Sequence, residues 1–321
     1  MFTDIPEAAL WEYRSDVPDP ADFDEFWSAT LAEAAEHPLD VTAEPWESGI
    51  TTIDIWDVTF SGFGGHRIRA WLLLPAGATG PLPGVVEYVG YGGGRGNPLE
   101  SLVWSSAGYA HLIMDSRGQG AGHHRGATPD PGGSGPAISG VMTRGIEDPA
   151  DYYYRRLFTD AVRAVDALKT FPQVDQSRIA VVGGSQGGAM TLAVAGLRND
   201  VVGAVAFVPF LSDMRRASEI TDAFPYRELG QYLAVQRDRV DMVFRTLSYF
   251  DGVNFAKRAT APVWYSVALM DATCPPSTVF ASYHEYAGPK QITVWPYNGH
   301  EGGAIEDLVM ALGALRQVFA E

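Results

Sequence analysis

The sequence predicts an α/β fold whose central sheet is mostly parallel but begins with antiparallel strands. Short, continuously apolar runs such as "GVVEYVG", "RIAVVG" and "AVAFV" alternate with helical segments, a pattern typical of parallel strands buried on both faces. Earlier, residues 53–74 alternate apolar and polar positions around the Gly-rich "SGFGG", which predicts an antiparallel hairpin. No Ser/Gly/Pro-rich linker divides the 321 residues, so we expect one domain over residues 1–321.

The elements follow in chain order. Residues 19–36 predict a helix that begins at Asp and Pro, carries an apolar stripe through Phe23 and Trp27, and packs outside the sheet. After the hairpin, six apolar runs predict strands: "GVVEYVG", "AHLIMD", "RIAVVG", "AVAFV", "VWYSVAL" and "ITVWPY". The intervening helices are expected on both faces of the sheet, over residues 160–171, 186–197, 277–286 and 305–319.

Two segments interrupt this alternation. Residues 117–151 are rich in Gly and Pro and longer than a usual strand-to-helix connection, which indicates a functional or interface loop. Residues 212–251 have a mainly helical pattern and are predicted to form a cap over the carboxyl edge of the sheet.

Composition excludes several classes of protein. Hydrophobic residues make up 46% and charged residues 19% of the chain, as in ordinary globular proteins, and the apolar runs are too short to cross a bilayer. The net charge of −16 argues against nucleic-acid binding. The N-terminus lacks the pattern of a secretory signal, so we expect a cytoplasmic protein without a membrane partner. The single cysteine, Cys274, excludes an intrachain disulfide.

The strongest chemical motif is "GGSQG" at residues 183–187. It matches the nucleophile elbow GxSxG, in which small neighbours let a strained turn lift a serine hydroxyl above the sheet. A strand is predicted before Ser185 and a helix after it, as the motif requires. The alternative is a tight glycine turn with a bystander serine.

A nucleophilic serine needs a histidine base and an orienting carboxylate, in the chain order Ser, Asp or Glu, His. Of the two histidines after Ser185, His284 lies inside a predicted helix and is expected to be structural. His300 follows the last predicted strand, at the edge of the sheet where ligands bind in such folds.

Asp271 ends a predicted strand at the same edge and is the preferred acid. Asp251 and Asp241 are weaker alternatives because they fall in the cap-like segment. An aspartate at a strand end can also be a simple turn residue.

The predicted oxyanion hole consists of the backbone N–H groups of Gln186 and Tyr91, the latter in the Gly-rich "YVGYGGGRG". A nucleotide-binding glycine loop is the alternative, but no acidic residue lies at the proper distance on a following strand. The side chains of Tyr91 and Trp104 are predicted to line the substrate site and limit the acyl group, although Trp104 could instead be a core residue.

No catalytic metal and no cofactor are predicted. Cys274 has no histidine at motif distance and is expected to be a small buried hydrophobic residue. The neighbouring His123 and His124 lie on a Gly-rich loop without further patterned ligands, which is a weak metal signal.

Three motifs occur together: "MDSRGQG" with Arg117 and Gln119, "GGSQG", and His300-Glu301. This combination resembles the acetyl xylan esterase and cephalosporin C deacetylase family, carbohydrate esterase family 7, of the α/β-hydrolase fold. Segments such as "TRGIEDPADYYYRRLFTDAVRAVDAL" and "LMDATCPPSTVFA" extend the similarity over nearly the whole chain.

The resemblance implies a serine esterase that removes acetyl groups from short xylooligosaccharides and from cephalosporin C. It places the triad on Ser185, Asp271 and His300, the oxyanion donors on Tyr91 and Gln186, and structural supports on Arg117 and Gln119. It also implies a homohexamer that takes small substrates and has an interface hairpin within residues 117–151. A peptidase, a broader short-chain carboxylesterase, or a non-catalytic binding protein of the same fold are the alternatives.

Overall fold

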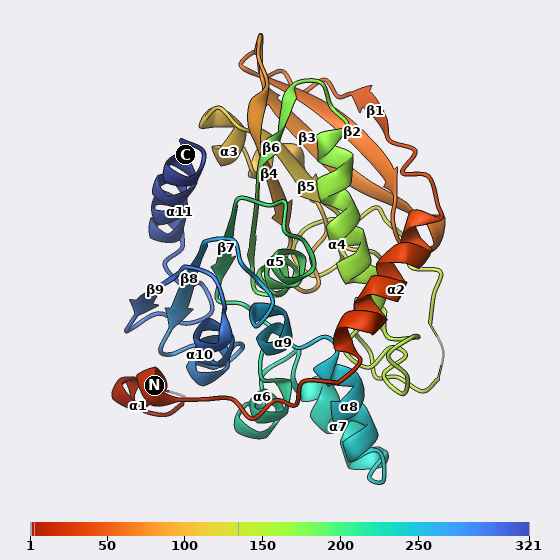
Figure 1. Cartoon of the computed structure of the whole chain (residues 1–321), viewed down its shortest axis with the longest axis vertical. Helices are drawn as coiled ribbons and strands as arrows, with labels where there is room; N and C mark the ends of the chain where they lie inside the picture. Colours follow the sequence, from red (N-terminus) through yellow and green to blue (C-terminus); the bar gives the residue numbers. More distant parts are fainter. Residues whose placement is uncertain (1, 3, 134, 321) are drawn as a thin grey trace.

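The computed structural model describes residues 2, 4–133 and 135–320. Nine strands form one sheet in the order β1-β2-β3-β5-β4-β6-β7-β8-β9 (Figure 1). The strands β1, β2, β3 and β5 pair antiparallel, and every later pair is parallel. The strands are β1 (Thr42–Pro45), β2 (Ile53–Ser61), β3 (Arg67–Pro75), β4 (Leu82–Tyr88), β5 (Ala110–Met114), β6 (Val174–Gly184), β7 (Gly203–Phe207), β8 (Val263–Ala268) and β9 (Lys290–Trp295).

This arrangement confirms the predicted mixed sheet. The hairpin β2–β3 has Asp57 opposite Trp71, and its alternating pattern buries Ile53, Ile55, Val58 and Phe60. In contrast, all residues of β5 and β8 are buried, because helices cover both faces of the parallel part. The short edge strand β1 was not predicted.

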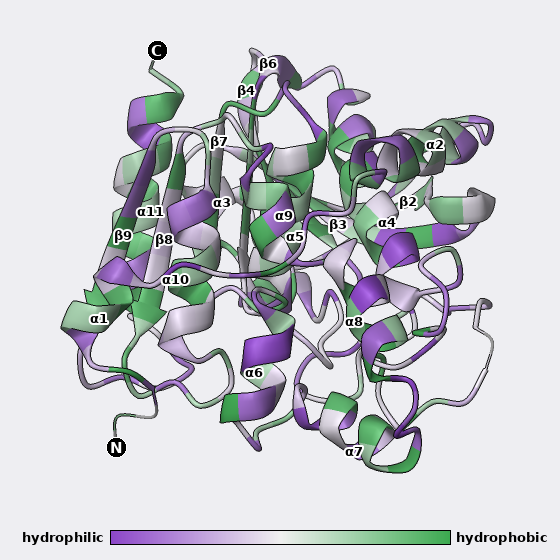
Figure 2. Cartoon of the chain, turned by 60° about the horizontal axis from the view of Figure 1, so that its bottom comes forward, coloured by the Kyte–Doolittle hydropathy of each residue, from purple (hydrophilic) through white to green (hydrophobic). Residues whose placement is uncertain are grey.

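Helices lie on both sides of the sheet, as expected for an α/β hydrolase (Figure 1). Figure 2 shows that α5 lies at the centre of the molecule and is largely apolar; it buries ten residues. The helices are α1 (Glu7–Glu12), α2 (Phe23–Ala35), η1 (Phe63–Gly65), η2 (Pro98–Glu100), α3 (Val103–Ser106), α4 (Tyr153–Lys169), α5 (Gln186–Leu197), α6 (Met214–Ile220), α7 (Arg227–Val235), α8 (Val240–Ser248), α9 (Gly252–Ala256), α10 (Pro276–Glu285) and α11 (Ile305–Val318).

Most predicted helices are present with small shifts at their ends. The exception is α4, which begins at Tyr153 rather than at residue 160. Its first turns contain tyrosines and arginines that do not form an apolar stripe in the sequence, yet Tyr153, Tyr154 and Arg156 are buried. Their hydroxyl and guanidinium groups find partners in other segments, which periodicity cannot reveal.

The structure also describes most of the two segments that interrupt the alternation of strands and helices. Residues 115–133 and 135–152 contain no helix or strand, and α6, α7 and α8 form the helical segment within residues 212–251. Figures 1 and 2 show these three helices together at one end of the molecule, beyond the sheet.

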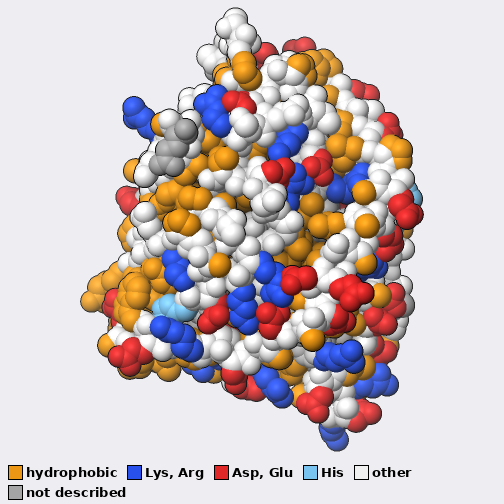
Figure 3. All heavy atoms as spheres, in the orientation of Figure 1, with side chains coloured by type: hydrophobic (Ala, Val, Ile, Leu, Met, Phe, Trp, Pro, Cys, Tyr) orange, Lys and Arg blue, Asp and Glu red, His pale blue; other side chains and the backbone are white. Residues whose placement is uncertain are grey.

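The surface carries acidic and basic side chains side by side on the face shown in Figure 3, without a broad basic patch there. Among the described residues, no helix is both long enough and apolar enough to span a bilayer.

Candidate active site

Ser185 occupies the sharp turn between β6 and α5. Its backbone has φ 55° and ψ −119°, a conformation that costs energy for a residue with a side chain and is typical of functional turns. The flanking glycines are needed because the backbone is crowded: a Cβ on Gly183 would lie 2.4 Å from the carbonyl carbon of Gly187, and one on Gly187 would lie 2.1 Å from the carbonyl oxygen of Tyr88. The motif therefore forms the elbow that its pattern predicts.

His300 and Asp271 lie beside this serine. His300 Nε2 is 3.0 Å from Ser185 Oγ, and His300 Nδ1 is 2.8 Å from Asp271 Oδ2. A carboxylate accepts hydrogen bonds, so Nδ1 carries the proton and Nε2 is left to accept the serine proton. The structure thus brings together the three residues selected from the sequence, across separations of 115 and 29 residues.

The aspartate is fixed more rigidly than the histidine. Asp271 is fully buried, and its Oδ1 accepts hydrogen bonds from the backbone N–H groups of Thr273 and Cys274 at 2.8 and 2.9 Å. The His300 side chain is 35% exposed. A buried, anchored carboxylate can orient the imidazole, while the imidazole itself is open to a substrate.

Cys274 lies closer to the triad than its sequence context indicated. It is buried, as expected, but its thiol interacts with the side chain of Ser185. Its sulfur, a carboxylate oxygen of Asp271 and a ring nitrogen of His300 lie within 4.8 Å of one another. Burial and the nearby Asp271 raise the pKa of the thiol well above its usual value, which disfavours the thiolate that a metal would require.

The predicted oxyanion loop forms a tight turn over residues 90–93. Gly93 N–H donates to Gly90 O at 3.1 Å, and Gly92 has φ +77°, which is typical of a type II turn with glycine at its third position. Within the described part of the chain, the N–H groups of Tyr91 and Gln186 donate to no protein acceptor. Both donors are thus available for a ligand.

The side chain of Gln119 connects the loop that contains Tyr91 with the helix that begins at Gln186. Its Oε1 accepts from Gly92 N–H at 2.7 Å, while its Nε2 donates to Gln186 Oε1 at 2.9 Å and to Tyr153 Oη at 2.8 Å. One side chain therefore fixes the oxyanion loop relative to the first turn of α5, which agrees with its predicted supporting position.

Glu228 on α7 was missed by the sequence analysis. Its Oε1 accepts from the Tyr91 hydroxyl at 2.6 Å and its Oε2 accepts from Met142 N–H at 3.1 Å. Burial raises the pKa of Glu228 above its usual value. The hydroxyl of Tyr91 is thus engaged by the cap, so its ring is the part left to contact a substrate. An isolated glutamate on a helix gives no sequence signal for this contact, which spans 137 residues.

The prediction that Trp104 lines the substrate site is wrong. Trp104 is 1% exposed and belongs to a core cluster with Val85, Val182 and residues of α11. Proximity to the Gly-rich loop in the sequence did not translate into proximity to the site, because η2 and α3 carry the chain onto the face of the sheet covered by α11.

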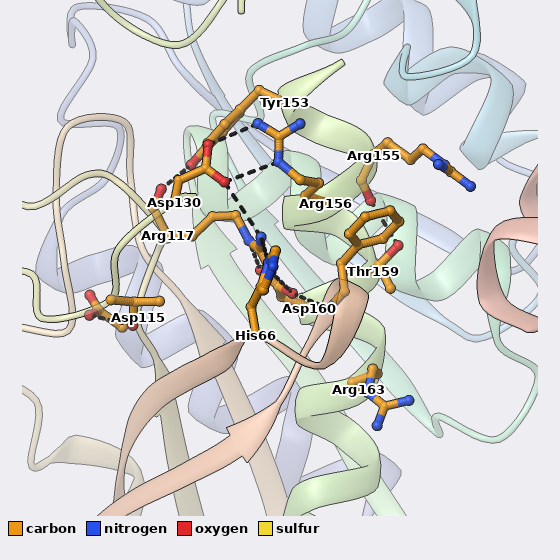
Figure 4. Close-up of polar contacts among 12 residues, drawn as sticks. His66, Asp115, Arg117, Asp130, Tyr153, Arg155, Arg156, Thr159, Asp160 and Arg163 are labelled. Atoms are coloured by element: carbon orange, nitrogen blue, oxygen red, sulfur yellow. Dashed lines mark hydrogen bonds and ion pairs between the residues drawn. The ribbon is translucent and has the colours of Figure 1, made fainter. Parts of the chain in front are cut away.

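Arg117 lies in a separate polar cluster with Asp160, Asp130 and His66 (Figure 4). It is fully buried, and it donates from Nε to Asp160 at 2.5 Å and from Nη2 to the same carboxylate at 2.7 Å. Although burial alone lowers the pKa of Arg117, the pairing with Asp160 raises it above its usual value. The Arg117 carbonyl accepts from Tyr153 Oη at 2.6 Å, which links this cluster to Gln119.

The alternative residues lie elsewhere. His284 Nδ1 is 2.8 Å from the carbonyl of Tyr13, and burial with nearby Arg14 lowers its pKa to about 4. Asp251 caps α9 and accepts from the N–H groups of Asp213 and Met214, and Asp241 lies on α8. These contacts support the structural interpretation of His284 and the preference for Asp271.

Comparison with known proteins agrees with this geometry. A structure of an acetyl xylan esterase from Paenibacillus sp. R4 is 40% identical, covers 98% of this chain and 99% of that chain, and superposes with a TM-score of 0.92. Acetyl xylan esterase 1 from Thermoanaerobacterium sp. JW/SL YS485 is 34% identical over the same shares, with a TM-score of 0.90.

A curated relative, acetyl esterase Axe7A of Xylanibacter ruminicola, is 30% identical over 286 residues, which is 88% of this chain. The chain spans 64% of the length of that relative. The family model for acetyl xylan esterase matches residues 1–309. The chain therefore belongs to the acetyl xylan esterase family, a family of carboxylic ester hydrolases.

Proposed function

We propose that this protein is a serine esterase that removes acetyl groups from small acetylated carbohydrates, such as xylooligosaccharides, through an acyl-enzyme on Ser185. The observation that carries the proposal is the continuous hydrogen-bonded chain from Ser185 through His300 to Asp271, at 3.0 and 2.8 Å. Beside it are two backbone N–H groups that donate to no acceptor among the described residues. The acetyl group and the xylan-derived substrate are inferred from the names of the similar structures, which are acetyl xylan esterases.

Acylation follows from the roles this geometry allows. As Ser185 Oγ attacks the acetyl carbonyl, His300 Nε2 takes its proton, and Asp271 stabilises the resulting imidazolium through Nδ1–H. The carbonyl oxygen becomes an oxyanion, which the N–H groups of Tyr91 and Gln186 would bind. His300 then gives the proton to the departing sugar oxygen, and acetyl-Ser185 remains.

Deacylation repeats these steps with water as the nucleophile. His300 takes a proton from the water, the same two N–H groups stabilise the second tetrahedral intermediate, and acetate leaves as the proton returns to Ser185. No step requires a cofactor or a metal ion. The hydrogen bonds of the oxyanion loop to Gln119 and Glu228 support these reaction steps because they fix the loop before substrate arrives.

Labelling with a fluorophosphonate tests the catalytic proposal against a non-catalytic binding protein. We expect stoichiometric labelling of the wild-type chain at Ser185 and loss of labelling in Ser185→Ala. A folded wild-type chain that neither reacts with the probe nor hydrolyses p-nitrophenyl acetate would contradict the proposal.

The acyl preference separates a deacetylase from a broader esterase or a peptidase of the same fold. If the ring of Tyr91 limits the pocket, each added methylene costs on the order of 1–3 kcal/mol, so butyrate esters should react roughly tenfold or more slowly than acetates. The measurement is kcat/KM for acetate, propionate, butyrate and octanoate esters. Rates that stay level or rise towards octanoate would overturn the acetyl preference.

Cephalosporin C is a second proposed substrate, because it is a small molecule that carries an acetyl ester. Its deacetylation can be measured beside that of acetylated xylooligosaccharides.

We also propose a homohexamer, a cytoplasmic location, and no nucleic-acid or membrane partner. Light scattering after size exclusion tests the oligomer; a monomeric mass would refute it and would leave the triad proposal standing.

A further inference from the structure

A second Gly-rich loop packs against the oxyanion loop and carries His123. Gly122 N–H donates to Gly92 O, and Gly94 N–H donates to His124 O, both at 2.9 Å. The ring of His123 lies over the turn: a Cβ on Gly93 would be 2.4 Å from its Cε1. His123 Nε2 and Ser185 Cβ both lie within 4.0 Å of the position that a Cβ of Gly90 would occupy. This exposed histidine and the proposed nucleophile therefore both border Gly90.

His123 hydrogen bonds with the backbone of the oxyanion residue itself. Its Nε2 is 3.1 Å from the carbonyl oxygen of Tyr91. A carbonyl can only accept, so Nε2 carries the proton. The other ring nitrogen, Nδ1, is 3.1 Å from His124 Nδ1. In the neutral pair, His123 Nδ1 accepts and His124 Nδ1 donates, which fixes the tautomer that the contact with Tyr91 requires.

With this contact, Tyr91 is held on three sides. Its hydroxyl donates to Glu228, its carbonyl accepts from His123, and the next N–H along the chain, that of Gly92, donates to Gln119. His123 and Gln119 hold the two ends of the peptide unit between Tyr91 and Gly92. A flip of this peptide would change ψ of Tyr91 and φ of Gly92, two of the torsions that define the turn. Together with the bond from Gly93 N–H to Gly90 O, the two side-chain contacts restrain the backbone of Tyr91, including the N–H assigned to the oxyanion.

We infer that His123 is a positioning residue of the oxyanion hole, acting by donation from Nε2 to the Tyr91 carbonyl. The inference rests on the proposed esterase function and adds a residue to it. A purely structural histidine on a loop would affect unfolding, and a substrate-contacting histidine would affect KM. A positioning residue should affect kcat, since the oxyanion forms in the transition state.

A matched pair of substitutions isolates the donor. In His123→Gln, the side-chain amide nitrogen can occupy the place of Nε2, whereas in His123→Asn it can reach only the place of Nδ1. We expect His123→Asn to lower kcat for p-nitrophenyl acetate about five- to tenfold, the scale of one hydrogen bond, with KM nearly unchanged. His123→Gln should stay within about twofold of the wild type.

A second readout uses a trifluoromethyl ketone, whose adduct with serine places an oxyanion in the hole. Its affinity should fall in His123→Asn by the same factor as kcat. The control is His284→Gln on α10, which removes another histidine contact to a carbonyl, that of Tyr13 in the N-terminal segment; kcat should not change. Thermal unfolding should give similar midpoints for all variants.

Several results would overturn the inference while the proposed function stands: an unchanged kcat in His123→Asn, an equal loss in His123→Gln, or a rise in KM at constant kcat. Failure of the proposed function is a different result, because the wild-type chain would then be inactive towards acetate esters and unreactive with fluorophosphonate.

Discussion

The triad and the cluster around Arg117 are both polar, but they differ in how completely their hydrogen-bonding groups are paired within the protein. In the Arg117 cluster, Arg117 and Asp160 are fully buried and bonded to each other twice (Figure 4). Around the triad, His300 is 35% exposed, and two N–H groups lack a protein acceptor among the described residues. In the buried cluster the charged groups are paired, because an unpaired buried charge would be destabilising. In the triad region the two N–H groups are left without protein acceptors, because they are to donate hydrogen bonds to a substrate oxygen.

The two regions are joined by Tyr153. Its hydroxyl donates to the Arg117 carbonyl and accepts from Gln119, which in turn holds the oxyanion loop. The comparison therefore predicts a division of labour: changes at the triad should alter activity with little effect on stability, and changes in the Arg117 cluster should alter stability first.

The largest effect is expected for Ser185→Ala. Without the nucleophile, turnover of p-nitrophenyl acetate should fall by about four orders of magnitude or more. Alanine keeps the Cβ of Ser185 and loses only the hydroxyl, so the thermal midpoint should change little. Turnover near that of the wild type, in a chain with a native circular dichroism spectrum, would show that Ser185 is not the nucleophile.

Asp271→Asn should come next. The amide can present its nitrogen to His300 and favour the wrong tautomer, so kcat should drop about 10³- to 10⁴-fold. The remaining oxygen can still accept from Thr273 and Cys274, so the fold should persist. The check is kcat together with a denaturation curve; a variant as active as the wild type would transfer the orienting role to another acid.

Asp160→Asn tests the opposite side of the comparison. Removing this charge takes away the ionic partner that Arg117 contacts twice and leaves only the longer ionic contact to Asp130 at 3.5 Å, which should cost about 3 kcal/mol of unfolding free energy. The control is Asp200→Asn, whose side chain is 43% exposed beside Lys169 and Arg198 and should cost about 1 kcal/mol or less. Equal losses in urea denaturation for both variants would contradict the distinction.

The smallest effect is expected from His66, which accepts from Arg117 at 3.1 Å. Burial and the Arg117 charge lower its pKa below the usual 6.5. The folded protein thus binds this proton more weakly than the unfolded chain, so His66 reduces stability as the pH falls below about 6.5. In His66→Asn, whose oxygen can replace Nδ1, the loss of unfolding free energy between pH 7.5 and 5.5 should be smaller. An unchanged loss would show that His66 binds its proton equally well in the folded and the unfolded chain, which would contradict the lowered pKa.

Local patterns were sufficient where function depends on local geometry. The elbow at Ser185 needs glycines at fixed offsets, and the apolar runs place His300 and Asp271 after strands that end at one edge of the sheet. The same reasoning was wrong for Trp104, because its position depends on where the chain turns after the Gly-rich loop, and it gave no sign of Glu228.

The sequence by itself determined the mixed sheet, the strand-to-helix turn at Ser185 and the set of residues able to serve it, since each follows from periodicity or from the steric needs of a turn. Only the tertiary structure decided which side chains surround that set. Tyr91 meets Glu228 across 137 residues and His123 across 32, and the Cys274 thiol lies against Ser185. Such contacts depend on how distant segments pack, and a buried polar group shows its partner only once the chain around it has folded.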